Sequence, residues 1–161
     1  MFRKLLAFIF PALLTILPGC DALIFQELKP GVSRDFEVRD RMGPPTMEWK
    51  EADGSVVWEY PRTPNGIVNY MVVIGPDSIL REIRQVLTEE NFAKVVPGMD
   101  KTAVRRLLGK PAEDAFYPLK KEWIWSWKIK DENRTQTFFD VHFDEPGRVL
   151  RSSRQERAMP G

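Results

Sequence analysis

The residues that could carry acid–base or metal chemistry gather in one short segment of this 161-residue chain. His142 is the only histidine, and it stands between Asp140 and Asp144 in the segment FFDVHFD. Alternate residues of a strand share a face, so these three side chains would lie together. They could serve a hydrolase or hold a metal ion, but no nucleophile motif or ligand-gathering loop accompanies them. We expect a surface-facing histidine, no metal site and no cofactor.

The only cysteine, Cys20, allows a different chemistry, because it ends an apolar segment. A basic head with Arg3 and Lys4 precedes the apolar run Leu5–Leu17, as in a secretory signal. As a helix this run would reach roughly 20 Å, too short for about 30 Å of hydrocarbon. The tail LPGC resembles the lipobox of bacterial lipoproteins. That resemblance implies that residues 1–19 are a signal peptide and that Cys20 becomes the lipidated first residue.

The alternative for this cysteine is an unpaired thiol in a secreted protein. Loss of the basic head would change the formal net charge from +1 to −1, so bulk charge does not indicate a nucleic-acid partner. A single cysteine also excludes a disulfide within the chain. The fold must therefore be held by packing, for which five tryptophans and an apolar fraction of 43% suffice.

The remainder of the sequence contains two similar halves. Glycines, prolines and aromatic residues recur in the same order about 67 positions apart. The matching segments are 25–31 with 92–98, 38–45 with 104–111, 57–60 with 124–127, and 76–85 with 146–155. In the last match Arg81 falls on Arg151. The repetition predicts two units, one over residues 20–87 and one over 88–161 with a short tail.

Each half reads as two helices followed by three strands. The helix-capping residues predicted are Thr88, Asp100 and Gly109 in the second half and Ser33 and Gly43 in the first. The strands predicted are 55–62, 67–74, 78–87, 121–129, 136–143 and 148–155. We therefore expect an α+β protein of two tandem ααβββ units, with antiparallel sheets and helices packed on one face.

The run from Gly98 to Pro111, a capped helix that ends in Leu-Gly-Lys-Pro, resembles the SmpA/OmlA family. Its BamE-like domain occurs in outer-membrane assembly lipoproteins. The tandem arrangement is similar to that of the β-lactamase inhibitor protein. The resemblance implies a BamE-like unit in each half, a periplasm-facing location with the outer membrane favoured, and a protein partner in the envelope. An aspartate directly after the lipidated cysteine retains lipoproteins in the inner membrane of enteric bacteria, so Asp21 keeps that location open.

Aromatic residues of one strand are the candidate partner-binding residues. Trp123, Trp125 and Trp127 alternate and share a face, and Trp58 and Tyr60 match the last two. One interpretation makes this face the core beneath the helices. The other makes it an exposed patch rimmed by Arg81 and Arg151, since Trp, Tyr and Arg dominate interface energetics. Arginines 148, 151, 154 and 157 are either a solvated edge or a contact to lipid phosphate.

These observations favour a lipid-anchored, non-catalytic protein-binding module in outer-membrane or envelope assembly. An inhibitor-type module that blocks an envelope or secreted enzyme through a tandem-sheet surface is the alternative. A small hydrolase centred on His142 is a third hypothesis.

The lipid anchor makes a first prediction. Mass spectrometry of the membrane-extracted protein should find Cys20 at the N-terminus with acyl chains attached. The Cys20→Ser variant should carry no lipid and should not partition into detergent. An unmodified Cys20 in the unaltered chain would contradict the anchor.

Overall fold

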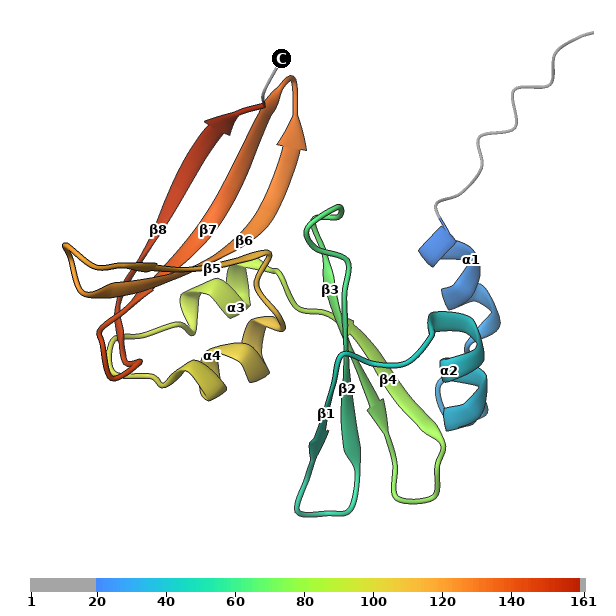
Figure 1. The fold of residues 1–161 in the computed structure, drawn as a ribbon. Coiled ribbons are helices and arrows are strands. Elements are labelled where there is room, and N and C mark those ends of the chain that lie inside the picture. Colours follow the sequence, from blue (N-terminus) through green and yellow to red (C-terminus); the bar gives the residue numbers. More distant parts are fainter. Residues whose placement is uncertain (1–19, 160–161) are drawn as a thin grey trace, which may run out of the picture.

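Two helices followed by four antiparallel strands occur twice along the chain (Figure 1). The computed structural model describes residues 20–159, so the expected signal peptide at 1–19 lies outside the described residues. The first unit contains α1 (Cys20–Glu27), α2 (Asp35–Met42), β1 (Met47–Lys50), β2 (Val56–Pro61), β3 (Asn69–Ile74) and β4 (Leu80–Gln85). The second contains α3 (Glu89–Ala93), α4 (Lys101–Leu108), β5 (Glu113–Tyr117), β6 (Glu122–Glu132), β7 (Thr135–Phe143) and β8 (Val149–Ala158). No helix within 20–159 is long and apolar enough to cross a membrane.

The predicted α+β class is confirmed, but each sheet has four strands where three were predicted. The strand orders are β1-β2-β3-β4 and β5-β6-β7-β8, and all neighbours are antiparallel. The unpredicted strands β1 and β5 lie at sheet edges. Their sequences, MEWK and EDAFY, are charged and largely exposed. Short, charged strands are common at sheet edges, where they discourage pairing with other chains.

The second unit's helices begin where their capping residues predict. The Thr88 hydroxyl accepts the N–H of Asn91 (3.3 Å), and the Asp100 carboxylate accepts the N–H of Ala103 (2.8 Å). The predicted cap Ser33 is wrong by one residue, because α2 follows Arg34. The Ser33 hydroxyl instead accepts the N–H of Lys29 (3.0 Å).

Each unit has its own core between its helices and one sheet face. In the first unit the core includes Val38 of α2, Trp58 and Tyr60 of β2, and Val72 of β3. In the second it includes Val104 and Leu108 of α4, Trp125 and Trp127 of β6, and Phe139, Val141 and Phe143 of β7. Trp58 pairs with Val72 and Trp125 pairs with Val141, so these tryptophans hold equivalent places in the two sheets.

The predicted match between the last strands is wrong by one position. Gly31 donates its N–H to the Leu80 carbonyl, and Gly98 donates to the Val149 carbonyl, both at 2.8 Å. Leu80 therefore corresponds to Val149 rather than to Leu150. A register shift follows Val73 in the first sheet and His142 in the second. Arg81 consequently corresponds to Leu150, and Arg151 corresponds to Glu82.

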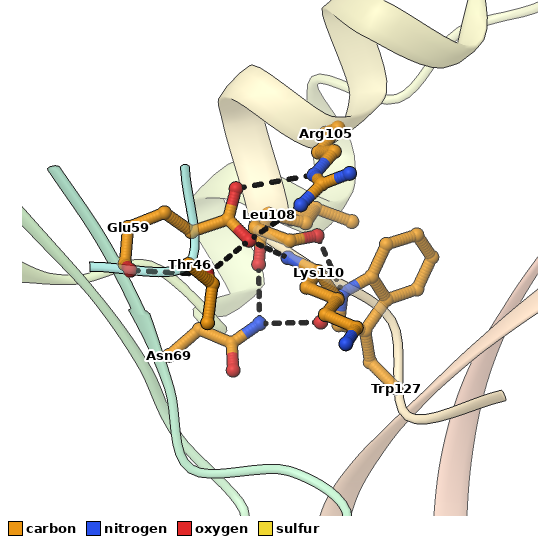
Figure 2. Close-up of polar contacts among 8 residues, drawn as sticks. Thr46, Glu59, Asn69, Arg105, Leu108, Lys110 and Trp127 are labelled. Carbon is orange, nitrogen blue, oxygen red and sulfur yellow. Dashed lines mark hydrogen bonds and ion pairs between the residues drawn. The ribbon is translucent and has the colours of Figure 1, made fainter. Parts of the chain in front are cut away.

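The two units meet where the end of α4 docks on the free face of the first sheet (Figure 2). Glu59 of β2 has a fully buried side chain (0% exposed). Arg105 donates to it from Nε and from an η nitrogen, both at 3.2 Å, and the Lys110 N–H donates to Oε1 at 2.9 Å. The Thr46 hydroxyl adds a bond of 3.2 Å. A buried carboxylate is tolerated only when it is paired and hydrogen-bonded, so Glu59 fixes the place of α4.

Asn69 of β3 makes the second polar contact of this junction. Its Nδ2 donates to the carbonyls of Leu108 (2.8 Å) and Lys110 (3.0 Å), while Trp127 Nε1 donates to the Gly109 carbonyl (3.1 Å). Carbonyls at a helix C-terminus lack partners within the helix, and these side chains supply them. Gly109 has φ +77 and ψ −172, so its φ is positive as predicted but its ψ is extended rather than left-handed. A Cβ there would also lie 2.9 Å from Asn69 Nδ2.

The junction makes a stability prediction. Glu59→Ala removes the carboxylate that Arg105 and the Lys110 N–H require, and should lower the free energy of unfolding by about 3 kcal/mol. Glu48→Ala is the matched control, because it breaks an exposed ion pair with Arg39. The side chains of Glu48 and Arg39 are 44% and 42% exposed. That loss should stay below about 1 kcal/mol. Urea unfolding followed by tryptophan fluorescence measures both, and equal losses would contradict the structural role of Glu59.

Candidate functional site

The aromatic strand face is core, so the first of its two interpretations holds. Trp127 is fully buried and Trp125 is 9% exposed, both packed beneath α3 and α4. Trp58 and Tyr60 are likewise buried, and the Tyr60 hydroxyl donates to the Gly43 carbonyl at 3.0 Å. Burial raises the pKa of Tyr60 to about 12. The prediction that these four rings bind a partner is therefore wrong, because a partner cannot reach them in the folded chain.

Trp123 lies at the edge of the same core and is covered by a cation. Lys101, the first residue of α4, holds its Nζ 3.9 Å from the Trp123 ring centroid and 5.1 Å from that of Trp125. Cation–π attraction favours this position, while desolvation lowers the pKa of Lys101. Trp123 therefore offers a partner only part of its ring.

Arg81 and Arg151 do not rim an aromatic patch. Arg81 donates to Asp77 at 2.6 Å in the turn before β4. Arg151 lies in β8 opposite His142, on the face of the second sheet that α3 and α4 leave uncovered. We name this the open face. No helix of residues 20–159 packs on it, whereas the corresponding face of the first sheet receives α4 (Figure 1).

The open face carries polar side chains that are buried by their neighbours on the sheet. Ser126 and Lys128 of β6 and Asp140 and His142 of β7 are each less than 9% exposed. Lys128 Nζ donates to Asp131 (2.8 Å) and to the Asn65 carbonyl of the first unit (3.3 Å). The face is therefore a pre-ordered polar surface rather than an apolar patch.

Arg157 of β8 reaches across the open face. It donates to both oxygens of Glu113 on β5 (2.9 and 2.8 Å), and its guanidinium lies 4.1 Å from the Phe138 ring centroid. Its nearest approach to Asp140 Oδ1 is 3.9 Å. That buried oxygen has no hydrogen-bond partner among the described residues. An unsatisfied buried acceptor is costly, and Arg157 is the cation that compensates the Asp140 charge from within the folded chain.

His142 lies opposite the apolar side chains of β7, as predicted, but it is 8% exposed rather than surface-facing. Its Nε2 is 2.9 Å from the Ser153 hydroxyl, and its Nδ1 is 3.2 Å from Glu122 Oε2. These distances resemble a Ser-His-acid triad. An η nitrogen of Arg151, however, lies 3.0 Å from Nδ1. Guanidinium groups only donate, so the contact to Arg151 requires Nδ1 to accept, whereas the contact to Glu122 requires it to donate.

Arg151 thus competes with His142 for the carboxylate that would orient the ring in a triad, and the geometry is that of an ion-pair network. Arg151 donates to both oxygens of Glu122 at 3.0 Å. This hydrogen bonding holds the pKa of Glu122 below its usual value. The third member of the candidate metal set, Asp144, accepts the backbone N–H of Arg148 (2.6 Å) in a turn. Within the described residues, no three His, Cys, Asp or Glu side chains gather as metal ligands.

Sequence reasoning missed the groups that define this surface and the junction. Glu59 carried a usable signal, since it is a carboxylate between two aromatic residues in an apolar strand. Glu122 and Ser153 carried none, because their contacts to His142 join three different strands. Arg157 was noted only as part of an arginine-rich tail.

Comparisons with known proteins agree with the second unit. Residues 85–153 match the sequence model of a family described as the outer membrane protein assembly factor BamE domain. The match begins at the end of β4 and ends within β8. No curated protein matches the chain. A crystal structure of a DUF4309 family protein (YjgB) from Bacillus subtilis aligns at 14% identity and a TM-score of 0.31, over 82% of this chain and 84% of that one.

The Glu122 network makes a pH prediction. Because its folded pKa is depressed, Glu122 stabilises the fold above its unfolded pKa of about 4.3. That contribution to stability is lost as the pH falls through the pKa that Glu122 has in the folded protein. Arg151→Ala should raise the pKa of Glu122 toward the ordinary value, measured by NMR titration of its carboxyl carbon. The control Arg148→Ala, which breaks an exposed contact to Asp100, should leave Glu122 unchanged. Identical Glu122 titrations in all three proteins would contradict the network.

Proposed function

We propose that the chain is a lipid-anchored, periplasm-facing, non-catalytic module that binds a protein partner in outer-membrane protein assembly. The match of residues 85–153 to the BamE domain supports the envelope setting. Lipid attachment at Cys20 supplies the membrane contact in this proposal. The outer membrane is the proposed location. The proposed division into units at residues 20–87 and 88–161 puts the BamE match almost wholly in the second unit.

The open face of the second sheet is the proposed docking surface. The observation that supports this choice is that helices cover the two sheets differently. The first sheet has helices of its own unit on one face and α4 on the other, whereas the second has helices on one face only. The chain thus contains one example of how such a face receives a helix end, through Glu59 and Asn69.

The chemistry of the open face suits a partner that presents charged groups of both signs. Its accessible charges are Arg151, Arg157 and Glu113, whose side chains are 48%, 32% and 49% exposed. Charge-assisted hydrogen bonds to these groups would hold a partner on the face. This mixture of both signs favours specificity over bulk attraction.

Site-specific photocrosslinking in membranes tests this proposal. A photoreactive residue at Gln155, exposed on the open face in β8, should yield a discrete adduct that mass spectrometry identifies as an envelope assembly protein. The matched control carries the same probe at Lys50, an exposed position in β1 of the first sheet. It should yield no such adduct. Equal adducts at both positions, or none at Gln155, would count against docking at the open face.

A further inference from the structure

The residue directly after Cys20 is held by a guanidinium from far along the chain. Asp21 lies in the first turn of α1. Arg62, just beyond β2, donates from Nε to both carboxylate oxygens at 3.1 Å and from an η nitrogen to Oδ1 at 2.8 Å. Both oxygens of Asp21 are therefore engaged. A two-point guanidinium–carboxylate pair is the strongest common form of charged hydrogen bond in proteins.

This pair is better protected than most surface ion pairs. The side chains of Arg62 and Asp21 are 27% and 28% exposed, whereas those of the Arg41–Glu27 pair at the other end of α1 are 52% and 54% exposed. Partial burial reduces the screening that weakens exposed pairs. The Asp21 charge is thus neutralised by a partner of the folded chain rather than by mobile counterions.

The backbone and the neighbouring rings hold Arg62 in place. Its N–H donates to the Val68 carbonyl (3.1 Å). Its guanidinium lies 5.8 Å from the Tyr70 ring centroid, and Tyr70 meets Phe25 of α1 edge-to-face at 4.8 Å. Ile24 of α1 and Leu28, the residue after it, add contacts to the first core. Arg62 and α1 are consequently positioned on the same sheet, and the pair forms with the fold.

We propose that Arg62 masks Asp21 as a membrane-sorting signal, so that this lipoprotein leaves the inner membrane despite an aspartate after its lipidated cysteine. The inference rests on the proposed lipid attachment at Cys20. A receptor can distinguish aspartate from other residues only by its carboxylate, through the negative charge or the two acceptor oxygens. Here both oxygens accept hydrogen bonds from Arg62, and the charge is compensated, once residues 56–74 have folded. The fold, rather than the residue alone, then decides the destination.

Sorting of the full-length chain in an enteric host tests the masking. Arg62→Gln keeps the length of the side chain but removes its charge, so most of the protein should shift from the outer-membrane to the inner-membrane fraction. The double variant Asp21→Ser with Arg62→Gln should return to the outer membrane. It lacks the same ion pair, so its return separates sorting from any loss of stability. Arg41→Ala, which breaks the exposed pair with Glu27, is the control and should remain in the outer membrane.

Palmitate labelling of every variant, beside Cys20→Ser, separates this inference from the anchor on which it depends. If the Arg62→Gln variant is labelled and stays in the outer membrane, the masking is overturned and the anchor is left intact. Labelled, unaltered protein found in the inner membrane overturns it as well. An absence of label in the unaltered chain removes the anchor, and the masking with it. A shift of Arg62→Gln that the double variant fails to reverse also contradicts the proposal.

Discussion

The buried carboxylate of Glu59 is the constraint on which the arrangement of the two units depends. Its side chain has no exposure to water, and three of its four hydrogen-bond donor groups come from Arg105 and Lys110 of the second unit. Taking a carboxylate out of water costs several kcal/mol unless partners replace the water. The first sheet is therefore stable in this form only with the end of α4 seated on it. Asn69 adds a hydrogen bond to the Leu108 carbonyl, and it lies so close to Gly109 that a Cβ there would clash with its amide.

This constraint makes the two similar units differ in which sheet faces are covered by helices. Docking of α4 leaves the first sheet with helices on both faces. The second sheet keeps one face without a helix in the described part of the chain, and that face lacks the carboxylate that seats α4 on the first sheet. Glu59 corresponds to Ser126, and Met71 corresponds to Asp140. The residues that bind the neighbouring unit in the first sheet have thus changed character in the second.

Local physics made part of this fold predictable. The helix caps and the strand alternation depend on interactions within a few residues. The caps Thr88 and Asp100 and the alternation of β6 and β7 could therefore be predicted from the sequence. Alternation also predicted which tryptophans share a face, but it cannot say which face the helices cover. The edge strands β1 and β5 were missed because they bury little. The match of β8 to β4 was wrong by one position, because the Leu-Arg pair occurs one residue later in β8 than in β4, although both sheets have their bulge at the same place. The site depended on side chains from separate strands, for which the sequence has no local signal.

The chemistry assigned to a side chain from its sequence neighbours can be reversed by a single long-range arginine. His142 has a serine and a carboxylate at triad distances, yet Arg151 binds both oxygens of that carboxylate and also contacts Nδ1 of the ring. Asp21 follows Cys20, the proposed lipidation site, yet Arg62 donates to both of its oxygens. In each case a guanidinium, which only donates and stays charged, removes the lone pairs or the free charge that the expected chemistry needs. A carboxylate or imidazole therefore acts as its motif implies only where no such donor is already bound to it.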